Sequence, residues 1–459
     1  SERIWRTYLR EKRTELMLAA QEEQLKTFPK EPRNIGVYLA RGAAFAENRD
    51  EAQAIATYRK AFELFRELYP DTSASPPPAQ ISDIAFSALQ RSADLEVTRA
   101  KALGTFSQLG EDQKKKWQDS LNQATDFYSQ AILGYSATKV PDALAKLVDV
   151  TFFRFQSGEA PVEDCLKPFR DLAAKASANP GLVAQILFSQ ASVPFKANQT
   201  ALALRLYEEA YKQATETKVS LGWRDLERFG QALLGAGKHE EARPIFERIQ
   251  KEFPASGPKD PKQFAQASAV YGLGLIDFKA GRKEESEKRF AQLAKDYPWS
   301  EKLQEANFLR GQALAESGKY DGTKEKPGAF DLWTEVIESN KADNETKAKA
   351  MLAFGKGLED VAAKKIATKQ IEQGVGKPPL DPLDLAVSYY QKVDLYYDSL
   401  PEFSAEGLLK GAKIRRSQQK NDEARKMVAN LLEKYGLSSS AAEARELLKS
   451  LPPASAPAT

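Results

Sequence analysis

The chain has 459 residues, and 67 Lys and Arg residues nearly balance 64 Asp and Glu residues, giving a net charge of +3. Such a small excess argues against a nucleic-acid or anionic-membrane surface as the basis of function. Hydrophobic residues make up 42% of the chain and charged residues 29%, which predicts a folded chain with a continuous core.

Cys165 and His239 are the single cysteine and the single histidine, which restricts the chemistry available to the chain. They cannot form an intrachain disulfide or a zinc site of Cys and His ligands, and a histidine-based catalytic triad would have to use His239. Cys165 has the helical spacing of a core residue, and His239 falls in a predicted turn. Phosphate-binding loops, nucleophile elbows and H-E-x-x-H motifs do not occur. We therefore predict no catalytic residue, no metal site and no cofactor.

The predicted elements are helices throughout, beginning with 3–27 inside an N-terminal segment, 1–34. This helix is expected to cap the array or to continue a segment upstream, since the chain starts at Ser1 without a methionine. A signal peptide or membrane anchor could precede it. Divergent helix pairs are expected over 35–220, at 35–70, 81–109 with 111–135, 141–155 with 162–177, and 181–197 with 200–217. Pro194 is expected to kink or shorten the helix at 181–197.

One pattern occurs twice in register within 221–340, and each landmark recurs 44 positions later. A glycine inside the first helix predicts close approach of its partner helix, and the next glycine predicts a left-handed turn. A small residue, an aromatic and an aliphatic residue then follow at helical spacing, and a proline ends the second helix. The two copies are Gly230, Gly237, Ala242, Phe246, Ile249 and Pro254, and Gly274, Gly281, Ser286, Phe290, Leu293 and Pro298.

This order of residues resembles the tetratricopeptide repeat, a helix pair of about 34 residues. The longer spacing is explained by a Pro- and Gly-bearing loop at 255–264, and a further inserted loop is predicted between Gly318 and Ala329. The resemblance implies an all-α fold, a right-handed α-solenoid of antiparallel helix pairs. About seven to nine such pairs are expected along the chain.

Divergent pairs are predicted again over 341–451. A long helix is expected at 345–373, with a mate that starts after Pro382. The last pair is expected at 405–419 and 421–435, followed by a polar capping helix at 439–451. The Pro-, Ala- and Ser-rich tail at 452–459 is expected to be disordered.

A partner-binding groove is predicted on the first helices, which line the concave face in the family that the chain resembles. A peptide or a partner helix would lie there, unless neighbouring helices or the 255–264 loop cover these side chains. The predicted groove residues are Tyr271, Leu275, Phe278, Phe308, Gln312, Arg224 and Gln231.

A narrower resemblance concerns the sequence between repeats. The residues 253–256 and 297–300 share the pattern aromatic-Pro-x-Ser, which is similar to repeats of bacterial cell-envelope proteins such as the Tol-Pal coordinator and the barrel-assembly lipoprotein. This resemblance implies a non-catalytic scaffold or adaptor in an envelope or membrane-associated multi-protein complex. A cytosolic regulator or chaperone-like adaptor and a glycan- or peptidoglycan-associated repeat protein are the alternatives.

Overall fold

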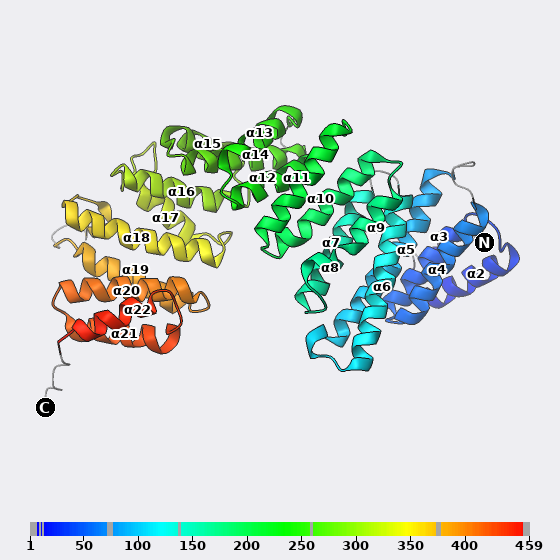
Figure 1. Cartoon of the computed structure of the whole chain (residues 1–459), viewed down its shortest axis with the longest axis horizontal. Coiled ribbons are helices and arrows are strands. Elements are labelled where there is room, and N and C mark those ends of the chain that lie inside the picture. The colour runs from blue at the N-terminus through cyan, green and yellow to red at the C-terminus, as the bar shows by residue number, and fades with distance from the viewer. Residues whose placement is uncertain are drawn as a thin grey trace. The chain divides into compact units, whose positions relative to one another are not determined.

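The structure is a computed structural model that describes residues 7–8, 11, 13–70, 77–135, 139–257, 260–372 and 378–452. Its elements in these ranges are α-helices and two short 3-10 helices, with no strand among the described residues (Figure 1). The predicted all-α class is therefore confirmed. None of the described helices has both the length and the apolar character that crossing a membrane requires.

The chain divides into two compact units, Ser1–Gly237 and Lys238–Thr459. The boundary between the units falls in the turn after Gly237, inside the first regular repeat. None of the boundaries of the five predicted segments lies at this position. The helices of the N-terminal unit are α2 (Thr14–Thr27), α3 (Asn34–Glu47), α4 (Glu51–Leu68), α5 (Ala79–Leu103), η1 (Phe106–Gln108), α6 (Glu111–Gly134), α7 (Val140–Gln156), α8 (Val162–Cys165), α9 (Lys167–Lys175), α10 (Pro180–Lys196), α11 (Thr200–Glu216) and α12 (Trp223–Gly235).

The C-terminal unit begins with α13 and ends with the predicted capping helix, α22. Its elements are α13 (His239–Glu252), α14 (Lys262–Lys279), α15 (Lys283–Asp296), α16 (Leu303–Glu316), α17 (Ala329–Glu338), α18 (Asn344–Lys364), η2 (Lys369–Ile371), α19 (Pro382–Tyr396), α20 (Pro401–Ser417), α21 (Asn421–Tyr435) and α22 (Ala441–Ser450).

Within each unit, helices pack as consecutive pairs, and each pair packs on the next. In the N-terminal unit α3 pairs with α4, α5 with α6 and α10 with α11, and in the C-terminal unit α14 pairs with α15, α16 with α17, α18 with α19 and α20 with α21. First helices also contact the first helices of neighbouring pairs, as α7, α10 and α12 do in one unit and α14, α16, α18 and α20 in the other. This stacking is the arrangement of an α-solenoid.

Glycines inside first helices allow aromatic rings of second helices to approach the backbone. At Gly274 in α14, an added Cβ would lie 2.6 Å from the ring of Phe290 in α15. Gly42 in α3 has the same relation to Tyr58 in α4, at 2.5 Å. The predicted close approach at Gly274 is therefore confirmed, and the same device recurs outside the two regular copies.

The turn glycines adopt the left-handed conformation that their positions predicted. Gly237 and Gly281 have φ angles of 75° and 73°, values that cost an L-residue conformational energy. In the first pair, where the sequence offers Asn48 and Asp50 instead of glycine, Arg49 takes φ 62°. Asp50 then caps α4 by accepting a hydrogen bond from the backbone N–H of Gln53, at 3.1 Å.

Three predicted helices differ from the structure. The helix expected at 162–177 is interrupted at Leu166, between α8 and α9, because Pro168 lacks a backbone donor and clashes with the preceding turn. The helix expected at 345–373 ends at Lys364, where Lys365 turns left-handed with φ 52°. The helix α10 is not shortened by Pro194 and continues to Lys196.

Some predicted segments fall outside the described residues. These are 1–6, 9–10 and 12 of the N-terminal segment, the 71–76 part of the loop after the first pair, 258–259 of the loop at 255–264, 373–377, and the tail from 453 onward.

Candidate functional site

A cleft of about 570 Å³ lies on three first helices of the N-terminal unit, α7, α10 and α12. Its apolar surface comes from the start of α7 and from the Trp223 ring at the start of α12. Its polar surface comes from α10, from α12 and from Asp142 of α7. The lining residues are Pro141, Asp142, Leu144, Ala145, Gln185, Ser189, Gly222, Trp223, Arg224, Asp225 and Arg228.

Two arginines one helical turn apart supply the positive charge of this cleft. Arg224 is exposed, and its guanidinium lies 5.1 Å from the centre of the Trp223 ring. Arg228 is half-buried and donates from Nη1 to Ser192 Oγ in α10, at 3.3 Å. A guanidinium held near an aromatic face and next to a cavity is suited to contact polar or acidic groups of a ligand.

Carboxylates oppose these arginines. Asp142 accepts a hydrogen bond from Gln90 Nε2 at 2.9 Å, so its side chain is already held by α5. Burial raises the pKa of Asp225 to about 6, against the opposing effects of Arg228 and of a hydrogen bond from the Gly222 backbone N–H. The charge of the cleft therefore changes between about pH 5 and pH 7.

An acceptor in the cleft is left without a partner. The side-chain oxygen Oε1 of Gln185 is buried and receives no hydrogen bond from the described residues. Buried polar atoms in native proteins are almost always paired, so an unpaired acceptor lining a cavity indicates a position for a donor from a ligand. Gln185 and Ser189 lie one turn apart on α10, which places both on the face that lines the cleft.

Asp225→Asn should stabilise the protein at neutral pH and much less at acidic pH. A folded pKa near 6, above the unfolded value of about 3.9, means that the folded state binds more protons and loses stability as pH rises between those values. The amide can still accept from the Gly222 N–H. We expect a gain of about 1–2 kcal/mol at pH 7.5, measured by thermal unfolding. An equal change in the unfolding midpoint at pH 4.5 would contradict the assigned pKa.

Of the seven predicted groove residues, Arg224 is the one that lines this cleft. Gln231 is half-buried in α12 and donates from Nε2 to Glu227 at 3.2 Å. In the C-terminal unit, Leu275, Phe278 and Gln312 are half-buried, and the first two pack against the core.

Tyr271 and Phe308 belong to the core of the C-terminal unit. They are 7% and 8% exposed, and the Tyr271 ring lies 6.2 Å from that of Phe290 and 5.5 Å from Lys302 Nζ. The expectation that both line an open groove is corrected here, because α15 and the start of α16 cover Tyr271. Binding by Leu275, Phe278 and Gln312 stays a prediction.

Four lining residues were not predicted from the sequence, namely Trp223, Arg228, Gln185 and Ser189. Part of their signal is local, since Gln185 with Ser189 and Arg224 with Arg228 are polar pairs at a spacing of four, which places each pair on one face of a first helix. The sequence does not show that α7 lines the same cleft, because this depends on how the three helices pack.

Cys165 lies in the core, as the sequence predicted, whereas His239 lies in a helix and not in the predicted turn. The Cys165 thiol is buried against the Ala160 carbonyl, and burial raises its pKa to about 11, which keeps it in the unreactive thiol form. His239 is the first residue of α13. Among the described residues, no group of His, Cys, Asp and Glu side chains could hold a metal ion.

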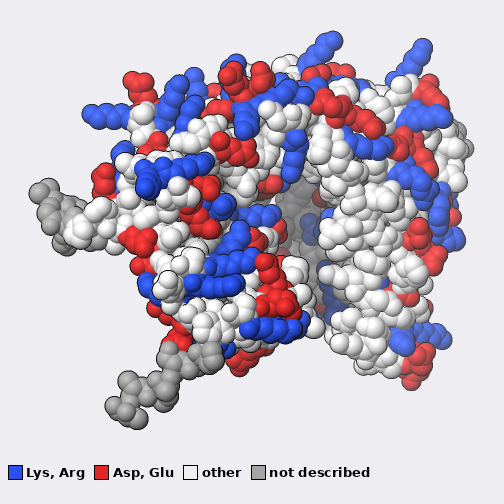
Figure 2. All heavy atoms as spheres, turned by 60° about the vertical axis from the view of Figure 1, so that its left-hand side comes forward, with Lys and Arg blue, Asp and Glu red and all other residues white. Residues whose placement is uncertain are grey.

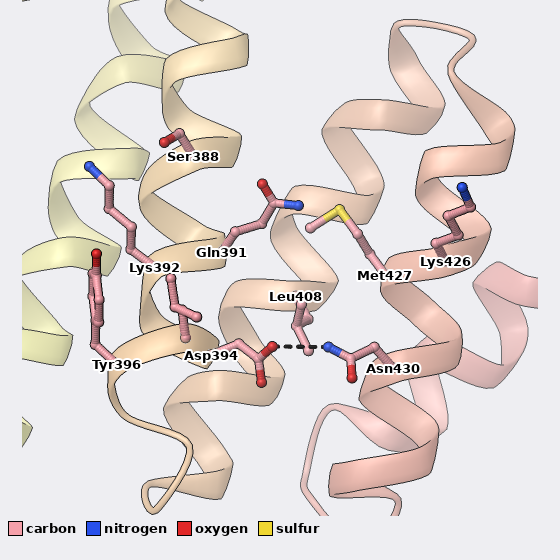
Figure 3. Close-up of a pocket in the computed structure, with 10 residues that line it drawn as sticks. Ser388, Gln391, Lys392, Asp394, Tyr396, Leu408, Lys426, Met427 and Asn430 are labelled. Carbon is pink, nitrogen blue, oxygen red and sulfur yellow. Dashed lines mark hydrogen bonds between the residues drawn. The ribbon is translucent and has the colours of Figure 1, made fainter.

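A second cavity lies in the C-terminal unit, on α19, α20 and α21 (Figure 3). On the face drawn in Figure 2, Lys and Arg are intermingled with Asp and Glu, in keeping with the small net charge of +3.

Stacked helix pairs with a cleft on their first helices define a helical-repeat protein. Residues 183–260 and 271–322 match the family model described as tetratricopeptide repeat, so this part of the chain is similar to that repeat. The matched range 183–260 includes the α10 and α12 walls of the cleft. No curated protein sequence matches the chain.

Several solved structures are similar to the chain. The apo form of the quorum sensor NprR from B. thuringiensis is 12% identical, with 88% of this chain and 99% of that chain covered and a TM-score of 0.45. Yeast Tom70 is 13% identical, with 97% and 93% covered and a TM-score of 0.40. A tetratricopeptide repeat protein from Parabacteroides merdae is 15% identical, with 78% and 98% covered and a TM-score of 0.33.

Proposed function

We propose that the chain is a non-catalytic scaffold or adaptor that holds a segment of a partner protein in the cleft on α7, α10 and α12. The observation that carries this proposal is the cleft itself, which combines apolar walls, two arginines and an unpaired acceptor on three successive first helices. Ligand sites commonly join an apolar lining to a few polar groups that fix orientation. Tetratricopeptide repeats generally serve protein–protein interaction, which agrees with this use.

The cleft fits a peptide segment better than a small metabolite. Its polar groups lie on different helices, so a ligand must extend from Gln185 on α10 to Arg224 on α12 to meet both. A backbone N–H can donate to Gln185 Oε1, and an acidic or amide side chain can accept from Arg224. An apolar side chain would then pack on Trp223, whose ring is half-buried.

The test is capture of partners by the full chain in its native organism, followed by mass spectrometry. The variant Arg224→Glu/Arg228→Glu should reduce recovery of the partner about tenfold or more, because it replaces both cations of the cleft. The control is Arg205→Glu, which changes an exposed arginine on α11 that pairs with Glu209 along its own helix. Equal recovery with the cleft variant and the control would refute the proposal.

The half-buried residues of α14, in the C-terminal unit, stay a second and separate proposed contact for a partner protein. In the same capture experiment Phe278→Ala would weaken recovery while leaving the helical content unchanged. Recovery equal to that of the unchanged chain would remove α14 from the binding surface.

We further propose that this scaffold acts in a bacterial envelope or membrane-associated assembly. The support is the aromatic-Pro-x-Ser pattern between repeats, as at Tyr297 and Ser300, which resembles envelope repeat proteins. Fractionation of the full-length protein in its native organism tests this setting. Recovery in the cytosol alone would favour a cytosolic adaptor instead.

A further inference from the structure

A cavity of about 540 Å³ lies on the second-helix side of the C-terminal unit, between α19 and α21. Figure 3 shows Gln391 of α19 and Met427 of α21 reaching toward each other across it, with Leu408 of α20 below them in the view. The lining residues are Ser388, Gln391, Lys392, Asp394, Leu395, Tyr396, Leu408, Lys426, Met427 and Asn430.

The cavity combines a buried apolar floor with an exposed apolar edge. Leu408 and Met427 are buried and form the floor. Leu395 and Tyr396, at the end of α19, are 70% and 59% exposed. Neighbouring large apolar side chains left in water next to a cavity mark an interaction surface more often than a lone exposed leucine does.

Two lysines, Lys392 and Lys426, give this cavity charged groups that a ligand can pair with, and both are positive. The one lining carboxylate, Asp394, is already engaged, since it accepts from Asn430 Nδ2 at 2.9 Å and from the Tyr435 hydroxyl at 2.7 Å. Lys392 Nζ lies 4.6 Å from the centre of the Tyr389 ring. Within the described ranges, neither Lys392 nor Lys426 forms an ion pair with a carboxylate.

We propose that this cavity docks an acidic amphipathic segment of a partner protein. An apolar side chain of that segment packs on Leu408 and Met427 beside Leu395, and acidic neighbours pair with Lys392 and Lys426. A purely apolar segment would leave the two ammonium groups without counter-charges, and a basic segment would be repelled by them. The surface belongs to the C-terminal unit and shares no residue with the cleft on α7, α10 and α12, so the chain would join two partners.

A displayed library of random 12-residue peptides, selected on the full chain, tests the proposal. Enriched peptides should carry Asp or Glu beside a large apolar residue. The most enriched peptide, labelled and followed by fluorescence anisotropy, should bind Lys392→Glu/Lys426→Glu about tenfold more weakly or worse. A version of that peptide with lysines in place of its acidic residues should regain binding to this variant.

The controls use residues of the same kind outside the cavity. Lys251→Glu/Lys295→Glu changes two exposed lysines of the same unit, and Leu437→Ser changes a fully exposed leucine. These variants should bind as the unchanged chain does, whereas Leu395→Ser should weaken binding about tenfold. Binding should also survive Arg224→Glu/Arg228→Glu, which separates this result from that for the cleft.

Three outcomes would overturn the proposal. The first is enrichment of basic peptides or of none, and the second is equal binding by the cavity and control variants. The third is self-association of the chain, measured by sedimentation, that Leu395→Ser abolishes. That result would mean that the surface binds a second copy of the chain.

Discussion

Replacing Asp277 by alanine is expected to lower the free energy of unfolding of the C-terminal unit by about 3 kcal/mol. The Asp277 side chain is 2% exposed at the end of α14, and three arginines from α13 and the α15 region surround it. Arg243 Nη2 and Arg282 Nε donate to Oδ1 at 2.7 and 2.8 Å, and Arg289 Nε donates to Oδ2 at 2.8 Å. Removing the carboxylate would leave three guanidiniums close together without their shared acceptor.

The size of this effect follows from the unequal burial of the partners. A buried ion pair that loses one member usually costs about 3–5 kcal/mol. The arginines are 22–39% exposed, so water can solvate them in part once Asp277 is gone, which places the loss at the lower end. Chemical unfolding followed by circular dichroism measures the loss, and amide hydrogen exchange should locate it in α13, α14 and α15.

The same cluster predicts that the free energy of unfolding falls as the solution becomes acidic. Burial alone would raise the pKa of Asp277, but the hydrogen bonds from its three arginines hold it below its usual range. A lowered folded pKa means that this stabilisation is present above the unfolded pKa of about 3.9 and is lost as pH falls through the folded value. Asp277→Asn should therefore flatten the acid side of the stability curve.

Glu252→Ala is the matched control, since Glu252 pairs with Arg248 at 2.8 Å on the surface of α13. Exposed ion pairs contribute little, so its unfolding midpoint should stay close to that of the unchanged chain. Equal losses for Glu252→Ala and Asp277→Ala would show that burial does not govern this network.

The sequence predicted the fold at positions where the local backbone conformation or a close neighbour requires one residue type. Gly281 was foreseen because a left-handed turn favours glycine, and Gly274 because a mid-helix glycine implies a close neighbour. The end of α18 was not foreseen, since Lys365 adopts φ 52° without being glycine. Its backbone is fixed by hydrogen bonds to the preceding turn, and residue type does not report them.

The candidate sites were less predictable because their residues come from separate helices. Asp277 looks like an ordinary charged residue in the sequence, and two of its three partners, Arg243 and Arg289, lie on other helices at separations of 34 and 12 residues. Tyr271 was expected in an open groove, and the side chains that cover it come from α15 and the start of α16, which the sequence of α14 does not report.

Trp333→Ala is expected to lower the free energy of unfolding by about 3–5 kcal/mol, the range for removing a large buried aromatic side chain. Trp333 is 2% exposed on α17, and its Nε1 donates to the Phe308 carbonyl of α16 at 3.2 Å. Its ring fits there because α16 and α18 carry glycines opposite it. An added Cβ at Gly311 would lie 2.3 Å from Nε1, and one at Gly357 would lie 3.1 Å from Cζ3.

Gly311→Ala tests this fit directly. In an open helix the change would stabilise by up to about 1 kcal/mol, but against Trp333 it should destabilise by about 1–3 kcal/mol. In a Trp333→Phe background, which lacks Nε1, the cost should shrink and give a coupling energy of about 1–2 kcal/mol in a double-mutant cycle. Gly36→Ala is the control, because an added Cβ at Gly36 meets nothing within 4 Å. If Gly311→Ala lowers the free energy of unfolding equally in both backgrounds, Gly311 is not needed to make room for the indole ring. The pairing of a first-helix glycine with a second-helix aromatic residue would then have no physical basis at this position.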